Sequence, residues 1–388
     1  MKEQSLNFFE SVLTPPKQEI LTWRKKFGRR FFHPFSIDSF LRMLVDNQFD
    51  VEPRYYGKLI AFALSTAVNT VPTVIERIRY SARIEATRLV ESPVFILGHW
   101  RNGTTFLHNL MSQDISFTCP RLYQVLFAGY FLLPRIKRLV ARLDQAMPAR
   151  VRPMDNVKMG MYEAWEDEFI LIGLSGISPY SRIWFPKRQG PSNNYLYPGF
   201  KSEAEARYWK KTFLTLLKRL TLLEAKTILL KSPTHTARIN TLLEMFPNSK
   251  FIHIARHPYD VFASNLKLWR DSFSLGFLQS VTEFEMVEMI FSTYEQMYQI
   301  YAAQKSNIPP HQLVEITFES LEQDPLGVLQ QVYQGLSLPG FDAFARRVSD
   351  YLATLKGYQK NRYSLPTEVK EVVQNRWRFA FDMFGYEP

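Results

Sequence analysis

The 388-residue sequence has one cysteine, Cys119, so no disulfide can form within the chain. A single thiol fits a reducing compartment, and we expect a cytoplasmic protein. The first residues do not resemble a signal peptide. No two histidines have the spacing of metal ligands, so we expect no metal site. Internal repeats and low-complexity segments are also lacking, which favours an ordinary globular chain.

Long uncharged apolar runs are few. Residues 59–75 are uncharged, but the run is shorter than the roughly 20 apolar residues of a membrane-spanning helix, and it contains Asn69 and Pro72. We expect it to form a buried or interfacial helix. Residues 122–134 form a second run, with four basic residues close behind it. That pattern suits contact with an anionic membrane surface, but we favour an amphipathic helix over the core.

Basic residues outnumber acidic ones, and the net charge is +11 with a pI near 9.5. This charge favours anionic ligands or an anionic membrane surface as partners. The basic residues are scattered along the chain, so we expect no nucleic-acid partner. The hydrophobic content of 46% is ample for a core. We expect residues 1–90 to form a helical N-terminal extension and residues 91–388 one compact domain, while the oligomeric state stays open.

A glycine-bracketed loop follows a short apolar run, residues 94–97, which predicts a buried strand. The loop lies between Gly98 and Gly103, where backbone N–H groups can approach a ligand closely, and Thr104 opens a helical stretch. A strand, such a loop and a helix N-terminus together favour the binding of an anion. The spacing is that of a nucleotide-phosphate loop, but its basic residue is Arg101, inside the loop, and the lysine of NTPases is absent.

A group of carboxylates lies in residues 158–172, which predict a helix in a basic protein. In a helix Glu163, Glu166 and Asp167 share one face, because they are spaced by three and four residues. Their mutual repulsion would raise the pKa of at least one carboxyl, as suits a general base. An exposed acidic face, or pairing with nearby arginines, is an equally good interpretation.

A second candidate strand, residues 227–230, is followed by Lys231. Open α/β sheets bind ligands at the carboxyl ends of their strands, so Lys231 is a candidate site residue. His235 follows at the start of a predicted helix. It is a candidate base because histidine titrates near neutral pH, although a histidine at this place can equally cap or pack the helix.

A third candidate strand, residues 251–255, is followed by Arg256, and Ser264 comes eight residues later on a predicted helix. Arginine can bind a phosphate with two parallel N–H groups, and serine can add a hydroxyl. In P-loop nucleotide hydrolases the corresponding strand ends in an aspartate that holds Mg²⁺. The arginine therefore argues against an ATP-dependent kinase.

These segments resemble the sulfotransferase family, whose donor is 3′-phosphoadenosine 5′-phosphosulfate (PAPS). Residues 100–105 match its 5′-phosphosulfate loop, Pro-Lys/Arg-Ser-Gly-Thr-Thr, except that Trp replaces Pro and Asn replaces Ser. Residues 256–264 match its 3′-phosphate motif, Arg-x-Pro-x-Asp-x-x-x-Ser, at every fixed position. The resemblance covers about residues 94–362 and implies an α/β fold, a P-loop-like parallel sheet flanked by helices.

The resemblance also implies roles for individual residues. Lys231 corresponds to a lysine near the sulfuryl group, and Arg101 lies beside that group. In the cytosolic branch of the family the catalytic histidine stands two residues after this lysine, where this chain has Pro233. The base therefore stays open between His235 and Glu166 with its neighbours. Phe106 occupies the place of an adenine-stacking tryptophan. The implied donor-binding set is Arg101, Asn102, Gly103, Thr104, Thr105, Phe106, Arg256, Ser264, Lys356 and Gly357, the last two in a basic loop that closes on the 3′-phosphate.

The hypothesis that joins these features is a metal-independent sulfotransferase. It would move a sulfuryl group from PAPS to a hydroxyl or amine of a small, hydrophobic acceptor by in-line attack. Arg101 and Lys231 would neutralise the charge that builds on the leaving phosphate oxygen. Two other hypotheses remain: an ATP-dependent P-loop kinase with a degenerate loop, and a non-catalytic protein that binds a membrane surface.

Overall fold

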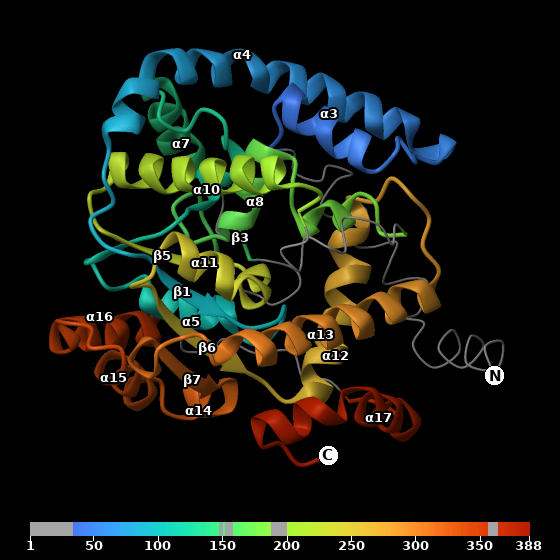
Figure 1. Cartoon of the computed structure of the whole chain (residues 1–388), viewed down its shortest axis with the longest axis vertical. Helices are drawn as coiled ribbons and strands as arrows, with labels where there is room; N and C mark the ends of the chain where they lie inside the picture. The colour runs from blue at the N-terminus through green and yellow to red at the C-terminus, as the bar shows by residue number, and fades with distance from the viewer. Residues whose placement is uncertain (1–33, 147–149, 152–157, 188–199, 356–363) are drawn as a thin grey trace.

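A parallel β-sheet forms the centre of the computed structural model, which describes residues 34–146, 150–151, 158–187, 200–355 and 364–388 (Figure 1). Its five strands lie in the order β2-β5-β1-β6-β7, and all paired neighbours are parallel. Their bounds are Val94–Leu97 (β1), Phe117–Thr118 (β2), Thr227–Lys231 (β5), Lys250–Ala255 (β6) and Leu313–Thr317 (β7). The expected α/β fold and the three candidate strands are confirmed.

Strand β1 lies between β5 and β6, and this register decides which chain segments meet. Phe95 is opposite both Leu230 and Phe251. The three strands run in the same direction, so the loop after β1, Lys231 and Arg256 all lie at one edge of the sheet. Later strands of the chain lie on both sides of β1, so the order of the strands reverses there. Such a reversal leaves a crevice at the carboxyl ends of the strands.

Alternate side chains of the strands enter two hydrophobic clusters, as the two-residue period of a strand requires. Phe95 lies in the cluster that includes residues of α10, α12, α13 and α17, whereas Ile96 lies in the one that includes residues of α5, α15 and α16. Cys119 is buried in the second cluster, and burial raises the pKa of its thiol to about 11. The helix bounds are Thr104–Met111 (α5), Asp167–Ser175 (α8), Glu203–Leu223 (α10), Ile239–Met245 (α11), Pro258–Asp271 (α12), Glu283–Lys305 (α13), Phe318–Gln323 (α14), Pro325–Gly335 (α15), Phe341–Thr354 (α16) and Thr367–Phe384 (α17).

The prediction of a helix over residues 158–172 was wrong for the first half of that segment. Residues Lys158–Met159 form β4, which pairs antiparallel with β3 (Arg150–Val151). The following backbone bonds to a neighbouring segment instead of to itself: Trp165 N–H donates to the Pro120 oxygen at 2.8 Å. Helix α8 therefore begins only at Asp167, and the shared carboxylate face of Glu163, Glu166 and Asp167 does not form.

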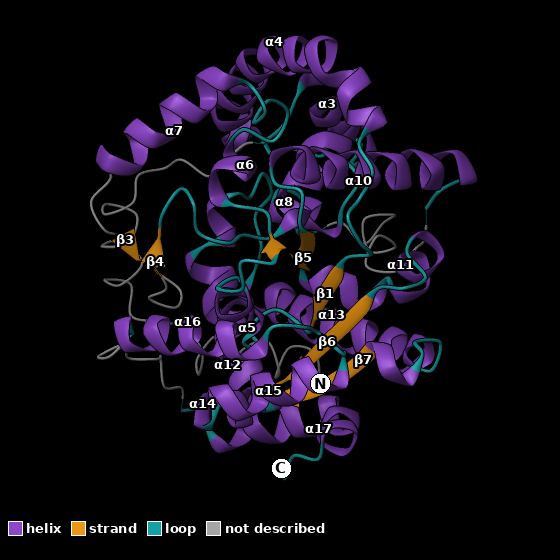
Figure 2. Cartoon of the chain, turned by 90° about the vertical axis from the view of Figure 1, so that its left-hand side faces the viewer, coloured by secondary structure: helices purple, strands orange, loops and turns teal. Residues whose placement is uncertain are grey.

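Two helices outside the sheet layers, α3 (Ile37–Asp46) and α4 (Tyr56–Ala86), lie along one end of the molecule (Figures 1 and 2). The helix expected over residues 59–75 is confirmed as part of α4, which is 31 residues long and more exposed than we expected. By length and composition alone, α4 with the turn before it is apolar enough to cross a membrane. The second apolar run forms buried α6 (Leu122–Leu126), and the basic residues that follow lie on α7 (Pro134–Ala146).

A buried ion pair fixes the inner side of α4 to the rest of the protein. Arg219 of α10 lies 2.6 Å from Glu76, and both side chains are almost fully buried. The N–H of Leu132 donates a further hydrogen bond to Glu76, also at 2.6 Å. Burial raises the pKa of the Glu76 carboxyl, while Arg219 and the Leu132 N–H oppose that shift.

We predict that Glu76→Ala lowers the free energy of unfolding by about 3–5 kcal/mol, because it leaves the Arg219 guanidinium buried without its carboxylate. Glu85→Ala, an exposed site on the same helix, is the control and is expected to change it by less than about 0.5 kcal/mol. Urea unfolding of both variants measures the difference. Equal losses would show that the ion pair does not hold α4.

Candidate active site

The loop after β1 has a backbone that few residues can adopt. Gly98 has a φ of 144° and Gly103 a φ of 89°, and a Cβ on Gly98 would lie 2.7 Å from the Ile254 carbonyl oxygen. The backbone of Arg101, between them, is also in the left-handed region, with a φ of 73°. A non-glycine residue in this region costs of order 1 kcal/mol, so neighbouring contacts must hold the loop in place.

Side-chain hydrogen bonds hold the loop in place. Asn102 donates from Nδ2 to the Ile254 carbonyl at 3.0 Å and to the Tyr298 hydroxyl at 2.7 Å. Thr236 accepts from Gly98 N–H at 2.8 Å, and Asn265 donates to the Trp100 carbonyl at 3.0 Å. Tyr298, Thr236 and Asn265 could not be predicted from the sequence, because they lie 138 to 196 residues from their partners in the loop.

The two phosphate-type motifs meet at Arg101. Its Nε donates to the Ser264 hydroxyl at 2.7 Å, and Arg256 donates from Nη1 to the Arg101 carbonyl at 3.2 Å. Asp260 accepts from the other end of Arg256 at 3.1 Å. The Arg256 guanidinium also lies 4.5 Å above the ring of Phe318. Loop and strand end thus form one basic site instead of two separate ones.

Helix α5 begins next to this basic site. Gly103 is its N-cap, and within the described part of the chain no side chain caps the helix. Thr104 and Thr105 are its first residues, so its N-terminal amides lie at the end of the loop. The ring of Phe106, in the next position, packs edge-on against Phe318 with a centroid distance of 6.4 Å. Lys356 and Gly357 lie outside the described residues.

Lys231 and Glu166 form a second centre beside the loop. Lys231 Nζ donates to Glu166 Oε1 at 2.5 Å and to the Thr105 hydroxyl at 3.4 Å. The other oxygen of Glu166 accepts from the Tyr180 hydroxyl, which in turn accepts from Trp100 Nε1 at 3.2 Å. Burial, and next the Glu166 carboxylate, raise the pKa of Tyr180 well above its usual value, so the phenol remains a donor.

The next two carboxylates, of Asp167 and Glu168, point into the protein. Asp167 lies 2.8 Å from Nε2 of His235 and accepts from Ser232 at 3.0 Å. Burial alone would raise the pKa of Asp167, but His235 and Ser232 outweigh it and hold the pKa below its usual value. Glu168 pairs with Arg238 at 2.7 Å. These groups are almost fully buried, so their structural role is to fix the start of α8 and thereby Glu166.

His235 is placed differently from Glu166. Its side chain is fully buried, and its ring packs near those of Phe95 and Phe213, with centroids 5.2 and 5.9 Å away. Glu166 keeps 16% of its side chain exposed and contacts Lys231. This arrangement favours Glu166 over His235 as the group that can reach a bound acceptor.

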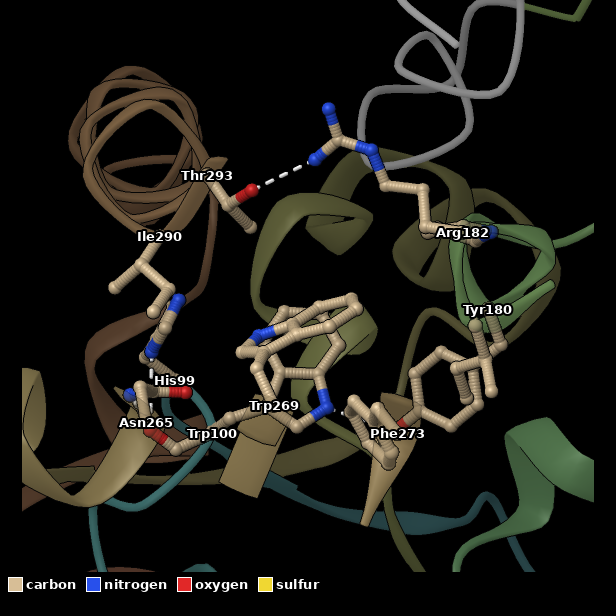
Figure 3. Close-up of a pocket in the computed structure, with 11 residues that line it drawn as sticks. His99, Trp100, Tyr180, Arg182, Asn265, Trp269, Phe273, Ile290 and Thr293 are labelled. Carbon is tan, nitrogen blue, oxygen red and sulfur yellow. Dashed lines mark hydrogen bonds between the residues drawn. The ribbon is translucent and has the colours of Figure 1, made fainter. Parts of the chain in front are cut away.

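A pocket of about 400 Å³, counting the part open to solvent, lies beside the loop (Figure 3). Aromatic rings dominate its wall, and Tyr180 and Trp100 connect it to Glu166. Arg182 donates to the Thr293 hydroxyl at 2.7 Å, its Nε has no partner among the described residues, and burial lowers the pKa of its guanidinium to about 10. The lining residues are His99, Trp100, Pro179, Tyr180, Arg182, Ile183, Asn265, Trp269, Phe273, Ile290 and Thr293.

We predict that Gly103→Ala destabilises the protein more than Gly340→Ala does. Both glycines have a φ near 80–90°, but a Cβ on Gly103 would lie 2.1 Å from the Phe318 ring, whereas Gly340 has open space. Gly340→Ala should therefore cost about 1 kcal/mol from backbone strain alone, and Gly103→Ala roughly 1–3 kcal/mol more from overpacking. Thermal and urea unfolding measure both. Equal costs would mean that the loop does not press against Phe318.

Comparison with known proteins completes the description of the site. Residues 93–343 match the model of the Sulfotransferase family. A curated relative from Mycobacterium bovis, omega-hydroxy-beta-dihydromenaquinone-9 sulfotransferase Stf3, is 32% identical over 352 residues, which are 91% of this chain and 90% of that protein. The protein of the same name from Mycobacterium tuberculosis gives the same values.

Solved structures show the same fold. Sulfotransferase STF9 from Mycobacterium avium matches with a TM-score of 0.65 at 18% identity, covering 87% of each chain. Sulfotransferase STF1 from Mycobacterium tuberculosis H37Rv matches with a TM-score of 0.61 at 17% identity, covering 94% of this chain and 98% of that one.

Proposed function

The chain belongs to the sulfotransferase family, and from that premise we propose that it transfers a sulfuryl group from PAPS to the hydroxyl of a small hydrophobic acceptor. As a sulfotransferase it is an enzyme, which sets aside the kinase and the non-catalytic binding protein. One observation supports PAPS as the donor, namely the hydrogen bond from Arg256 to the Arg101 carbonyl. Because this bond joins the two phosphate-type motifs, a single site can offer one cation to each phosphate group of a nucleotide that carries two of them.

The residues present fit such a donor. Arg101, Arg256 and Lys231 supply positive charge, and the N-terminus of α5 adds backbone N–H groups. We assign Asn102, Gly103, Thr104 and Thr105 to the 5′-phosphate, and Arg256 with Ser264 to the 3′-phosphate. Phe106 is the proposed adenine contact. The role of Lys356 and Gly357 stays a prediction.

The transfer step forms one bond and breaks one. The acceptor oxygen attacks sulfur, and the bond from sulfur to the 5′-phosphate oxygen breaks, leaving its electron pair on that oxygen. The hydroxyl proton goes to Glu166, whose carboxylate has lone pairs beyond those used by Lys231 and Tyr180. Arg101 and Lys231 stabilise the charge on the leaving oxygen, and in a partly buried site such stabilisation is strong.

The pocket beside Glu166 is the proposed acceptor site. Its aromatic rings suit an apolar molecule. The curated relatives are named for action on omega-hydroxy-beta-dihydromenaquinone-9, a hydroxyl compound. Both observations support a hydrophobic alcohol as the acceptor class.

We predict that Arg101→Ala lowers turnover by about 10²- to 10³-fold with little effect on folding, because it removes a cation from the leaving oxygen. Arg347→Ala, an exposed arginine on α16, is the control and should keep wild-type turnover. The measurements are labelled-PAPS transfer to long-chain and isoprenoid alcohols, and calorimetric binding of 3′-phosphoadenosine 5′-phosphate. Stabilisation of the wild type by ATP with Mg²⁺ but not by this nucleotide would overturn the proposed donor.

We predict that Glu166→Gln lowers kcat by roughly 10²- to 10⁴-fold, because the amide cannot take the acceptor proton. Glu163→Gln tests a second carboxylate of the same segment, three residues before Glu166, and we expect it to have the smaller effect on kcat. Rates are compared at equal concentrations of folded protein, as judged by circular dichroism. A larger loss of kcat in His235→Gln than in Glu166→Gln would assign the base to His235.

A further inference from the structure

Helix α4 presents an apolar stripe to the outside of the protein. Seven of its apolar side chains recur every three or four residues, which places them on one face of the helix. Each is between 50% and 77% exposed. The only charged residue between positions 56 and 75, Lys58, turns inward, where its Nζ donates to the Phe277 carbonyl at 2.8 Å. The stripe consists of Tyr56, Ile60, Leu64, Val68, Val71, Ile75 and Ile78.

The opposite face of α4, which contacts the protein, buries apolar side chains toward its ends and polar ones in its middle. Asn69 accepts from the Tyr130 hydroxyl at 2.7 Å, Thr73 is buried, and Glu76 pairs with Arg219. A helix on the surface of a protein in water normally has its apolar face toward the core. The orientation of α4 is therefore suited to an apolar medium on its outer side.

Helix α3 extends the apolar surface. The two helices are joined where Ile37 N–H donates to the Thr70 hydroxyl at 3.0 Å, and Figures 1 and 2 show them side by side. The exposed charges of α3 have partners: Asp38 lies 3.9 Å from Arg77, and the Arg42 guanidinium lies over the Tyr208 ring. Four apolar side chains spaced by four residues are exposed along α3 and just beyond it, namely Ile37, Leu41, Val45 and Phe49.

Basic side chains border this apolar surface. Beyond the middle of α4 its exposed face carries Arg77, Arg79 and Arg83, and α7, which lies beside α4 in Figures 1 and 2, exposes Arg135, Lys137, Arg138 and Arg142. An apolar surface bordered by arginine and lysine matches the interface of a bilayer with anionic headgroups. A second copy of the chain would bring equally basic surface against it, since the net charge is +11.

We propose that the outer face of α3 and α4 docks the protein on an anionic lipid bilayer, with α4 lying in the plane of the interface. The helix does not cross the bilayer, because Glu76 and its polar neighbours fix its inner side to the protein. The apolar stripes enter the boundary between headgroups and acyl chains, and the arginines and lysines contact the anionic headgroups.

The test is flotation of the full chain with vesicles of phosphatidylcholine, with and without phosphatidylglycerol. We expect binding to the mixed vesicles and about tenfold weaker binding for Leu64→Glu, which puts a charge into the stripe. Ile115→Glu is the matched control, because Ile115 is 61% exposed and Leu64 65%, but Ile115 follows α5 and lies outside the docking face. It should bind like the wild type.

A charge variant on α7 separates the contribution of the basic residues to lipid binding from that of the apolar stripe. Arg138→Glu on α7 should reduce the preference for phosphatidylglycerol and leave the weak binding to pure phosphatidylcholine unchanged. Absence of binding to mixed vesicles, or equal binding by Leu64→Glu and the wild type, would overturn the proposal. So would a dimer in lipid-free solution that Leu64→Glu converts to a monomer. None of these measurements depends on sulfuryl transfer, so their failure leaves the proposed activity standing.

Discussion

The hydrogen bond from Arg256 to the main-chain oxygen of Arg101 is the contact on which the site depends. It joins the end of β6 to the loop after β1, and it brings the Arg256 guanidinium against the backbone of Arg101. Each arginine side chain has its own acceptor, because Arg101 donates to the Ser264 hydroxyl and Arg256 donates to the Asp260 carboxylate. The fold thus keeps both cations in fixed positions, so that an anionic ligand can bind them without first ordering the side chains.

The parts of this arrangement that are local in sequence could be predicted, and those that depend on distant contacts could not. Strand β1 was predictable because it is buried on both faces and therefore continuously apolar. Arg256 and Ser264 were predictable because a strand end and the next helix fix their spacing. Tyr298 was not, because its contact with Asn102 spans 196 residues. The division at residue 90 stays a prediction.

One error, and one helix orientation that the sequence left open, have physical causes that only the folded chain shows. Residues 158–166 have the composition of a helix, but their backbone pairs with the segment around Arg121 through the bridge to Ala164. The apolar stripe of α4 has the same period whether it faces the core or the outside. The pairing of Glu76 with Arg219 on α10 turns the stripe outward together with the other contacts of the inner face, and that pairing cannot be read from the sequence.

The lone thiol of the chain has a practical consequence. Cys119 is 3% exposed, and its raised pKa keeps it protonated and unreactive at neutral pH. A cysteine introduced at any exposed position would therefore be the one group that a maleimide or spin label modifies, with no background substitution needed. The depth to which the α4 stripe enters a bilayer, and distances between the loop after β1 and α12, are open to spectroscopy on an otherwise unaltered protein.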